Sequence, residues 1–352
     1  MSSYITKWLA PLGLAFLLVA CKPADNSQTH THAEQHLTGN TMGTYYSIKI
    51  VGVDAAQAQD LQNQIDLRLD AVNQQMSTYL ADSELSRFNQ SREPDPFAVS
   101  ADTAKVVTAA LQLGKQTQGA LDVTVGPLVN LWGFGPDARP EQVPTQQQLD
   151  LTRAYTGLEH LRVTYDVHGQ YLYKAIPELY VDLSSIAKGF GVDAVSEYLA
   201  EQGLSNHLVE IGGEVRISGY NGHDKPWTIA VEKPHSEADR SDELVQQVVL
   251  PGNNSVATSG DYRNYYELDG QRISHTIDPK TGHPITHNLA SVTVIHPSCM
   301  IADGLATALT VMGTERALAF AEQHELAVYL LTKTEDGFRV DMTPAFKKYL
   351  RG

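Results

Sequence analysis

Cysteine is almost absent from this chain, since Cys21 and Cys299 are the only two among its 352 residues. If Cys21 is consumed by lipidation, as its neighbours suggest below, no intramolecular disulfide can form. We therefore expect Cys299 to be a buried, unreactive thiol, which is the common state of an unpaired cysteine in a folded domain.

Basic residues are also few compared with acidic ones. The chain carries 26 Lys and Arg against 41 Asp and Glu, which gives a formal net charge of −15. So acidic a surface repels phosphate backbones, and this argues against nucleic-acid binding. Any anionic ligand must then be met locally, by a cation or by backbone N–H groups. Hydrophobic residues make up 42% of the chain, which is enough for a packed core.

Several common motifs of nucleotide-binding and hydrolytic enzymes are missing. The chain has no Gly-x-Gly-x-x-Gly after a strand, no Gly-x₄-Gly-Lys-Ser/Thr, no His-Glu-x-x-His and no Gly-x-Ser-x-Gly. The usual signals of Rossmann domains, P-loop enzymes, zinc proteases and α/β-hydrolases are therefore absent.

The N-terminus has the pattern of a secreted lipoprotein. Lys7 precedes an apolar stretch that ends at residue 20 and is too short to span a bilayer. Residues 18–21, Leu-Val-Ala-Cys, resemble a bacterial lipobox, in which the cysteine is acylated, for example with palmitate. An ordinary signal peptide with an incidental cysteine is the alternative. We expect a signal peptide over 1–20, a flexible tether over 21–37 held to the membrane by lipidated Cys21, and a folded domain over 38–352.

Hydrophobic periodicity predicts an α+β fold, mostly antiparallel sheet with flanking helices. Apolar residues alternate over 44–51, as in a strand, and recur at helical spacing over 55–76. A β-hairpin with Gly169 in its turn is expected over 161–173. Several strands follow one another directly, which disfavours a doubly wound fold. Other helices are expected at about 101–117, 186–202 and 302–323, and other strands near 206–218, 226–232, 245–250, 271–277, 290–296 and 326–332.

A first polar cluster lies where a strand gives way to a helix. Residues 182–189 read Asp-Leu-Ser-Ser-Ile-Ala-Lys-Gly, which puts Lys188 in the first turns of the helix. Free N–H groups at a helix start attract phosphate, and a nearby lysine strengthens that attraction. The alternative is plain N-capping by Ser184 or Ser185.

A second cluster opens the long helix near the C-terminus. Asp303 and Thr307 are four residues apart, so their oxygens lie on one helix face. A carboxylate and a hydroxyl so placed suit Mg²⁺, which prefers hard oxygen ligands and completes its octahedron with water or phosphate. The alternative is that Asp303 caps the helix and Thr307 bonds back to the helix backbone.

Two more segments carry polar or aromatic side chains but are weak signals alone. His275 lies on a predicted strand that runs into the turn 278–282, and a lone histidine is more often structural than catalytic. Asp122 lies in a loop of small residues over 119–127, followed closely by Trp132 and Phe134, which could line a planar ring.

Together these segments stand in an order seen in a known enzyme family. The chain resembles the ApbE family of FAD:protein FMN transferases over about residues 38–350. Each motif alone is weak, and the resemblance rests on their combination and order. The matching segments are Thr41-Met42-Gly43-Thr44, Ser77-Thr78-Tyr79, Gly119 to Thr124, Asp182 to Gly189, Ser259-Gly260-Asp261-Tyr262, Ser274 to Pro279 and Ala302 to Thr307.

The resemblance implies an ApbE-like, T-fold-related domain that transfers FMN from FAD to a threonine hydroxyl as a phosphoester and releases AMP. It assigns Mg²⁺ to the side chains of Asp303 and Thr307 and to the backbone carbonyl of Ser185. It makes His275 the expected general base, because imidazole titrates near neutral pH, with Asp303 as the competing base. The implied FAD contacts are Met42, Tyr79, Ala120, Leu121, Asp122, Asp182, Lys188, Ile273 and His275.

The resemblance also implies partners and a place in the cell. Family targets are subunits of sodium-translocating NADH:quinone reductase or related ion-pumping redox complexes, so we expect lipid anchoring on the periplasmic side of the inner membrane. Anchoring in the outer membrane is the alternative. Rival functions are a Mg²⁺-dependent FAD pyrophosphatase that gives FMN and AMP, a flavin-binding lipoprotein without turnover, and a structural envelope lipoprotein.

Overall fold

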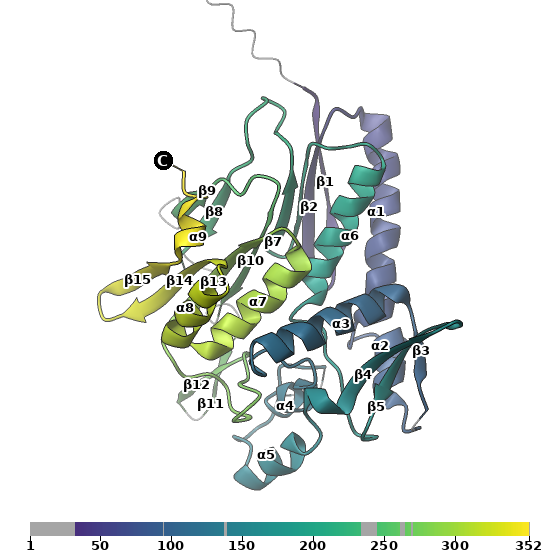
Figure 1. Cartoon of the computed structure of the whole chain (residues 1–352), viewed down its shortest axis with the longest axis vertical. Helices are drawn as coiled ribbons and strands as arrows, with labels where there is room; N and C mark the ends of the chain where they lie inside the picture. Colours follow the sequence, from purple (N-terminus) through teal and green to yellow (C-terminus); the bar gives the residue numbers. More distant parts are fainter. Residues whose placement is uncertain are drawn as a thin grey trace, which may run out of the picture. The chain divides into compact units, whose positions relative to one another are not determined.

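The computed structural model describes residues 32–93, 95–136, 139–233, 245–260, 265–268 and 270–351. Its largest element is an antiparallel sheet of eight strands, in the order β1-β2-β6-β7-β10-β13-β14-β15 (Figure 1). The predicted α+β class with mostly antiparallel sheet is confirmed. The strands are β1 (Glu34–Thr41), β2 (Thr44–Val51), β6 (His207–Ile211), β7 (Glu214–Ser218), β10 (Ser255–Gly260), β13 (Leu289–His296), β14 (Ala327–Thr334) and β15 (Gly337–Met342).

Ordered structure begins ahead of the expected domain boundary. β1 starts at Glu34, and the His32 N–H donates to the Gly222 carbonyl at 2.8 Å, so the last residues of the predicted tether 21–37 pair with the rest of the domain. The predicted signal peptide and the lipidation site Cys21 lie outside the described residues. Within the described ranges, no helix combines the length and apolar character needed to cross a bilayer.

One face of the large sheet is covered by helices (Figure 1). Buried side chains at helical spacing, such as Ile65 and Leu69, pack on alternate residues of the strands, such as Ile48 and Ile50. The helices that pack here are α1 (Ala55–Met76), α6 (Ala187–Glu201), α7 (Cys299–Met312) and α8 (Thr314–Gln323).

The opposite face of the same sheet has its own apolar core. Successive residues of β14 alternate between the two sides, because side chains of a strand point to opposite faces. Val328 and Leu330 belong to the core under α7 and α8. Tyr329 and Leu331 instead pack with Phe346 of the short helix α9 (Pro344–Lys347). Burial on both faces explains why β14 is an almost continuous apolar run.

Most of the smaller elements lie below the large sheet in Figure 1, and a pair of strands that contains Val231 and Val249 packs with α9 on its second face. A three-stranded sheet has the order β3-β5-β4, and two further pairs of strands are β8 with β9 and β11 with β12. These elements are α2 (Glu84–Gln90), β3 (Phe97–Val99), α3 (Ala101–Gln116), α4 (Gly126–Leu131), α5 (Gln146–Arg153), η1 (Leu158–His160), β4 (Leu161–Asp166), β5 (Gly169–Lys174), β8 (Ile229–Glu232), β9 (Val245–Val249), β11 (Tyr265–Leu268) and β12 (Gln271–Ser274).

Two predicted elements differ most in extent from the observed ones. The strand expected near 206–218 is the hairpin β6–β7, which turns at Gly212 and Gly213 with φ of 59° and 102°. The helix expected over 302–323 begins earlier, at Cys299, and breaks at Gly313, whose φ of 76° ends α7. The predicted strand 44–51 and helix 55–76 are confirmed to the residue.

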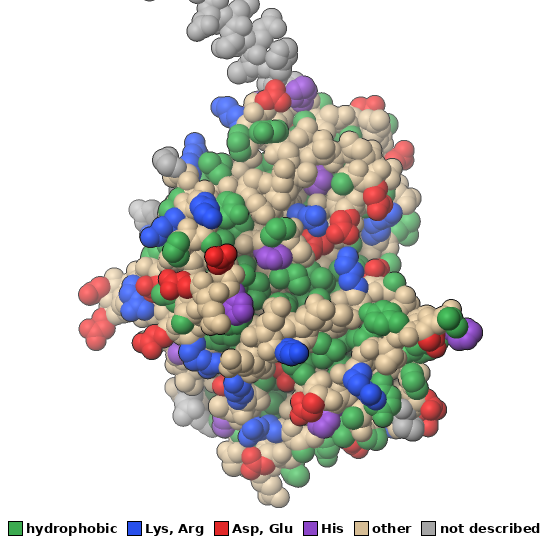
Figure 2. All heavy atoms as spheres, viewed as in Figure 1, with side chains coloured by type: hydrophobic (Ala, Val, Ile, Leu, Met, Phe, Trp, Pro, Cys, Tyr) green, Lys and Arg blue, Asp and Glu red, His purple; other side chains and the backbone are tan. Residues whose placement is uncertain are grey.

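The charged side chains visible in Figure 2 do not gather into a patch of one sign. On the face drawn in Figure 2, Lys and Arg side chains lie singly among acidic and uncharged ones. Large apolar side chains are exposed at separate places, including Leu67 on α1, Tyr79 beyond its end and Val167 in the β4–β5 turn. Scattered exposed apolar residues are normal for a folded domain.

We expect Asn89→Ala to lower the free energy of unfolding by about 2–4 kcal/mol, because it orphans two buried backbone groups. The Asn89 carboxamide accepts from the Val181 N–H and donates to the Val181 carbonyl, each at 2.8 Å. Urea unfolding measures the effect, and the exposed neighbour Gln90→Ala is the control. Equal stabilities of the two variants would contradict the assignment.

Candidate functional site

The starts of α6 and α7 touch, and this contact organises the site. A Cβ atom placed on Gly189 of α6 would lie 2.4 Å from the carbonyl oxygen of Cys299 and 2.8 Å from the Cβ of Asp303. Any side chain at position 189 would push the two helices apart. Glycine therefore allows Asp303 of α7 to reach the first turn of α6.

A hydrogen bond at this contact satisfies a backbone N–H at the start of α6. Gly189 is the third residue of α6, and the first N–H groups of a helix have no carbonyl partner within it. The Gly189 N–H donates to Oδ2 of Asp303 at 2.9 Å. No backbone N–H in the described part of the chain donates to the Ser185 carbonyl. This oxygen is therefore available to a ligand at the start of α6.

Three charged side chains share this region. The Lys188 Nζ lies 2.6 Å from Oε2 of Glu214, whose side chain is only 4% exposed. Burial raises the pKa of Asp303 to about 7, although the Lys188 ammonium opposes the rise. Burial alone would lower the pKa of Lys188, but Asp303 and Glu214 hold it above its usual value. Two carboxyl groups thus face one ammonium, an arrangement that favours a further cation.

Thr307 lies one turn beyond Asp303 on α7 and is half-buried. Its hydroxyl forms no hydrogen bond with any described residue, whereas the Thr310 hydroxyl donates to the Ala306 carbonyl at 2.8 Å. The alternative in which Thr307 bonds back to its own helix is therefore wrong. The free hydroxyl keeps its oxygen available on the same helix face as Asp303.

The capping alternatives for both clusters are also wrong. The N-cap of α7 is Ser298, whose side chain accepts from the Ile301 N–H, and Asp303 lies in the second turn. The N-cap of α6 is Ile186, which makes no side-chain capping bond, so neither Ser184 nor Ser185 caps this helix. Asp303, Ser184 and Ser185 therefore do not cap the helices that the sequence suggested for them.

The oxygens assembled here fit Mg²⁺. The carboxylate of Asp303, the hydroxyl of Thr307 and the carbonyl of Ser185 are hard ligands, and three protein ligands leave positions for water or phosphate. Among the residues that the structure describes, no group of three or more His, Cys, Asp and Glu side chains could hold a metal ion. A Mg²⁺ site at the α6–α7 contact would therefore combine one carboxylate with uncharged oxygens.

A second wall of the site comes from the loop after α3. Oδ1 of Asp122 accepts from the Thr124 N–H at 2.7 Å and from the Thr124 hydroxyl at 2.6 Å. The Asp182 N–H donates to the Val123 carbonyl, and Oδ1 of Asp182 accepts from the Ser184 N–H, both at 2.8 Å. Burial raises the pKa of both carboxyl groups. These bonds fix the loop to the segment that leads into α6.

Aromatic side chains connect this wall to the segment around His275. The Tyr79 hydroxyl donates to the Phe134 carbonyl at 3.5 Å. Partial burial and, to a lesser extent, the negative charge of Asp182 raise the pKa of Tyr79. The Phe134 ring lies 5.1 Å from Tyr266 and 6.2 Å from His275, centroid to centroid. Three segments far apart in sequence therefore meet here: the one after α1, the one after α4, and the β11–β12 hairpin with His275.

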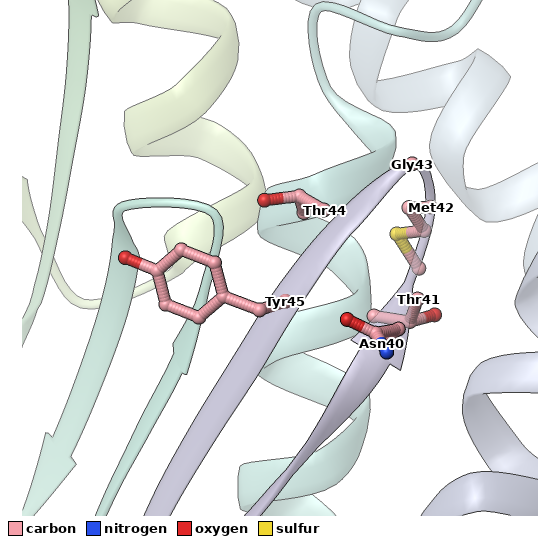
Figure 3. A pocket seen from close by; sticks show the side chains of 6 residues that line it. All are labelled: Asn40, Thr41, Met42, Gly43, Thr44 and Tyr45. Carbon is pink, nitrogen blue, oxygen red and sulfur yellow. The ribbon is translucent and has the colours of Figure 1, made fainter. Parts of the chain in front are cut away.

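Met42 reaches the site from the tip of the β1–β2 hairpin (Figure 3). It has a φ of 50°, and its Cε would lie 2.7 Å from a Cβ placed on Gly191 of α6. An open pocket lies over this hairpin and is lined by Asn40, Thr41, Met42, Gly43, Thr44 and Tyr45. The hairpin thus forms an edge of the site next to α6.

Three expected ligand contacts have buried side chains. Ala120 and Leu121 are part of the main core, and Ile273 packs with Leu128 and Trp132. Only their backbone atoms could meet a ligand without a change in packing. Leu121 also lies close to Gly304, where a Cβ would be 3.3 Å from it, so the loop abuts α7 as well.

The sequence reasoning missed Glu214. It is buried, carries the ion pair to Lys188 and lies at the first residue of β7. The available signal was the pair Gly212-Gly213, which marks a tight turn, followed directly by an acidic residue in an apolar strand. Its partner is distant in sequence, so nothing local pointed to the ion pair.

The model of the ApbE family matches residues 42–330 of the chain. Among curated proteins, the FAD:protein FMN transferase of Vibrio cholerae serotype O1 is 54% identical over 97% of this chain and 98% of its own length. The protein of the same name from Escherichia coli K12 is 46% identical over 97% of both chains.

Solved structures give the same result. The flavin transferase ApbE from Vibrio cholerae superposes with a TM-score of 0.82 at 54% identity, covering 91% of this chain and all of the other. The apo flavinyl transferase ApbE of Pseudomonas stutzeri also gives 0.82, at 39% identity, and covers 91% of this chain and 98% of its own.

Asp303→Ala is expected to lower the free energy of unfolding by about 1–3 kcal/mol, because it leaves the buried Gly189 N–H without an acceptor. Asp303 is only 6% exposed, so its loss removes a buried hydrogen bond. Asp303→Asn keeps an acceptor of the same shape and should recover most of the loss. Denaturant unfolding without divalent cations measures both, and a wild-type stability for Asp303→Ala would exclude the structural role.

Proposed function

The chain belongs to the ApbE family, and from this premise we propose that it is a Mg²⁺-dependent FAD:protein FMN transferase. The observation that carries the proposal is the free carbonyl of Ser185 and the free hydroxyl of Thr307 beside the buried carboxyl of Asp303, next to Lys188. An arrangement of hard oxygens and an ammonium suits a pyrophosphate substrate with a divalent cation.

The proposed reaction transfers one phosphoryl group. The oxygen of a target threonine forms a bond to the phosphorus of the FMN half of FAD, and the bond from that phosphorus to the AMP oxygen breaks. The threonine proton leaves to a base on the enzyme, and AMP carries away the electron pair of the broken bond. The products are a threonine phosphoester of FMN and free AMP.

Mg²⁺, when bound, would polarise the phosphoryl oxygens and neutralise developing negative charge. Asp303, Thr307 and the Ser185 carbonyl would hold it. Glu214 keeps the Lys188 ammonium charged and directed into the same region, where it can pair with phosphate oxygens. These two cations would offset the repulsion that a chain with a net charge of −15 exerts on FAD.

His275 is the proposed general base, with Asp303 as the alternative. His275 is half-buried at the end of β12 and lies beside the ring of Phe134, at the edge of the aromatic cluster. Asp303 is bonded to the Gly189 N–H and assigned to the cation, so it is a poorer proton acceptor than an imidazole.

The aromatic cluster is the proposed place for a ring of FAD. Tyr79 is 67% exposed, so its ring face is open to a planar ligand and its loss should not damage the core. Tyr266 is held by a bond from its hydroxyl to the Trp132 carbonyl at 2.7 Å, which stiffens the cluster around Phe134.

We further propose that the enzyme works on the periplasmic side of the inner membrane, tethered through a lipidated Cys21. Its targets would be subunits of sodium-translocating NADH:quinone reductase or related ion-pumping redox complexes. The lipobox pattern of residues 18–21 and the polar segment after it support this placement. Anchoring in the outer membrane is the competing location.

The decisive experiment incubates the enzyme with FAD, MgCl₂ and a threonine-bearing domain of such a target. A transferase gives a target of increased mass that carries covalent flavin, together with an equal amount of AMP. Free FMN with unmodified target would identify a pyrophosphatase instead. FAD binding without AMP release would identify a flavin-binding protein without turnover.

Thr307→Val should raise the Mg²⁺ concentration for half-maximal flavin transfer about tenfold or more, since changes around metal ligands cost that much in affinity. Valine keeps the shape of threonine and removes only the oxygen. Covalent flavin on the target, measured over a Mg²⁺ titration, reads out the change.

Thr310→Val is the matched control, because the Thr310 hydroxyl is bonded to the Ala306 carbonyl on the same helix. It should keep the wild-type Mg²⁺ response. A wild-type response in Thr307→Val as well would remove Thr307 from the metal site.

Lys188→Ala should weaken FAD binding about 10–100-fold, the equivalent of one lost hydrogen bond to a charged group, and riboflavin binding far less. Riboflavin has no phosphate for the ammonium to meet. Because the variant also leaves Glu214 buried without its ion pair, Lys188→Ala with Glu214→Ala serves as the companion. Fluorescence titrations with both flavins measure binding, and equal losses would place Lys188 away from the pyrophosphate.

A further inference from the structure

Asp193 is a buried carboxylate that has no place in the proposed reaction, yet it is fully bonded. It lies on α6, is 4% exposed, and uses both of its oxygens. Oδ1 accepts from the Cys299 N–H at 2.9 Å and from Arg216 at 2.7 Å. Oδ2 accepts from the Ser298 hydroxyl at 2.7 Å and from the Met300 N–H at 3.0 Å.

Three of these four bonds are donated by residues at the start of α7. The first N–H groups of a helix have no partner within it, and a carboxylate there also interacts favourably with the helix dipole. Asp193 satisfies two of them, those of Cys299 and Met300, while Ser298 satisfies the N–H of Ile301. The helix that carries Asp303 and Thr307 is therefore capped by a residue of the neighbouring helix.

The spacing of these contacts fixes α7 against α6. Gly189 and Asp193 are four residues apart on α6, and Cys299 and Asp303 are four residues apart on α7. Residues at this spacing lie on one face of a helix. Asp193 binds the Cys299 N–H, and the Gly189 N–H binds Asp303, so two polar links hold the helices together one turn apart.

Strand β7 also makes two polar links to α6. Glu214 and Arg216 are two residues apart, so their side chains leave the same face of the strand. Glu214 pairs with Lys188 and Arg216 pairs with Asp193, so both salt bridges run from β7 to α6. The Arg216 guanidinium also compensates the buried charge of Asp193, which would be costly alone.

We propose that Asp193 is a positioning residue for the metal site: it sets the placement of α7 on α6 and thereby the meeting of the Ser185 carbonyl with Asp303 and Thr307. The inference rests on the proposed Mg²⁺ site. Groups that orient metal ligands affect metal affinity even though they never touch the metal. A displacement of α7 relative to α6 would therefore lower the affinity for Mg²⁺.

The test is Asp193→Asn, which keeps the shape of the side chain. Its amide oxygen can still accept from Arg216 and the Cys299 N–H, but its NH₂ group then faces the Met300 N–H, a donor against a donor. Mg²⁺ binding, measured by titration calorimetry with MgCl₂ alone, should weaken about 10–100-fold. In the transfer assay the half-saturating Mg²⁺ should rise by a similar factor, with a much smaller change in the rate at saturating Mg²⁺.

Thr343→Val is the control for loss of stability alone. Thr343 is 1% exposed, donates to the Leu326 carbonyl at 2.7 Å and accepts from the Val328 N–H at 3.1 Å, at the start of α9. Its loss removes buried hydrogen bonds from the other face of the sheet. This variant should melt earlier than wild type and keep the wild-type affinity for Mg²⁺.

If Asp193→Asn does not fold, Ser298→Ala takes its place, because it removes one of the bonds to Asp193 and should give a smaller shift in the same direction. Wild-type Mg²⁺ affinity in the folded variant would overturn the inference. Equal losses of affinity in Asp193→Asn and Thr343→Val would overturn it too. Absence of Mg²⁺ binding by the wild-type protein would instead refute the proposed metal site itself.

Discussion

The close approach of α6 and α7 at Gly189 is the constraint on which the rest of the site depends. With no side chain at position 189, the backbone of α7 comes near enough for Asp303 to accept from the Gly189 N–H. This contact buries the Asp303 carboxyl group at the start of α6, where the Ser185 carbonyl accepts from no described backbone N–H. The packing of the two helices therefore sets the polar groups from which the site is built.

Burial gives this contact its electrostatic character. Charges removed from water interact strongly, and each is costly unless it is paired. Asp303 has a pKa of about 7 because desolvation outweighs its favourable partners. A divalent cation would restore its ionised form and balance Glu214 at the same time. With a cation bound beside Lys188, this acidic domain would offer an anionic substrate a local site of positive charge.

Much of the fold follows from local signals, and the failures come from partners that are distant in sequence. Helix 55–76 was predicted to the residue because its spacing is regular and Asp54 and Gln57 form a capping box at its start. The start of α7 was misplaced because part of its cap comes from Asp193, more than a hundred residues earlier. Asp303 and Lys188 stood out in sequence, each in a polar cluster at a helix start. Glu214 did not, since its role exists only through a partner on another element.

The central claim is that a divalent cation binds where α6 meets α7, and a crystal of this protein grown with Mn²⁺ in place of Mg²⁺ tests it most directly. Anomalous scattering locates the ion without reference to activity. We predict one strong peak within bonding distance of the Asp303 carboxylate, the Thr307 hydroxyl and the Ser185 carbonyl, at about 2.0–2.2 Å from each oxygen. A peak bound elsewhere, or none at this contact at saturating Mn²⁺, would contradict the account.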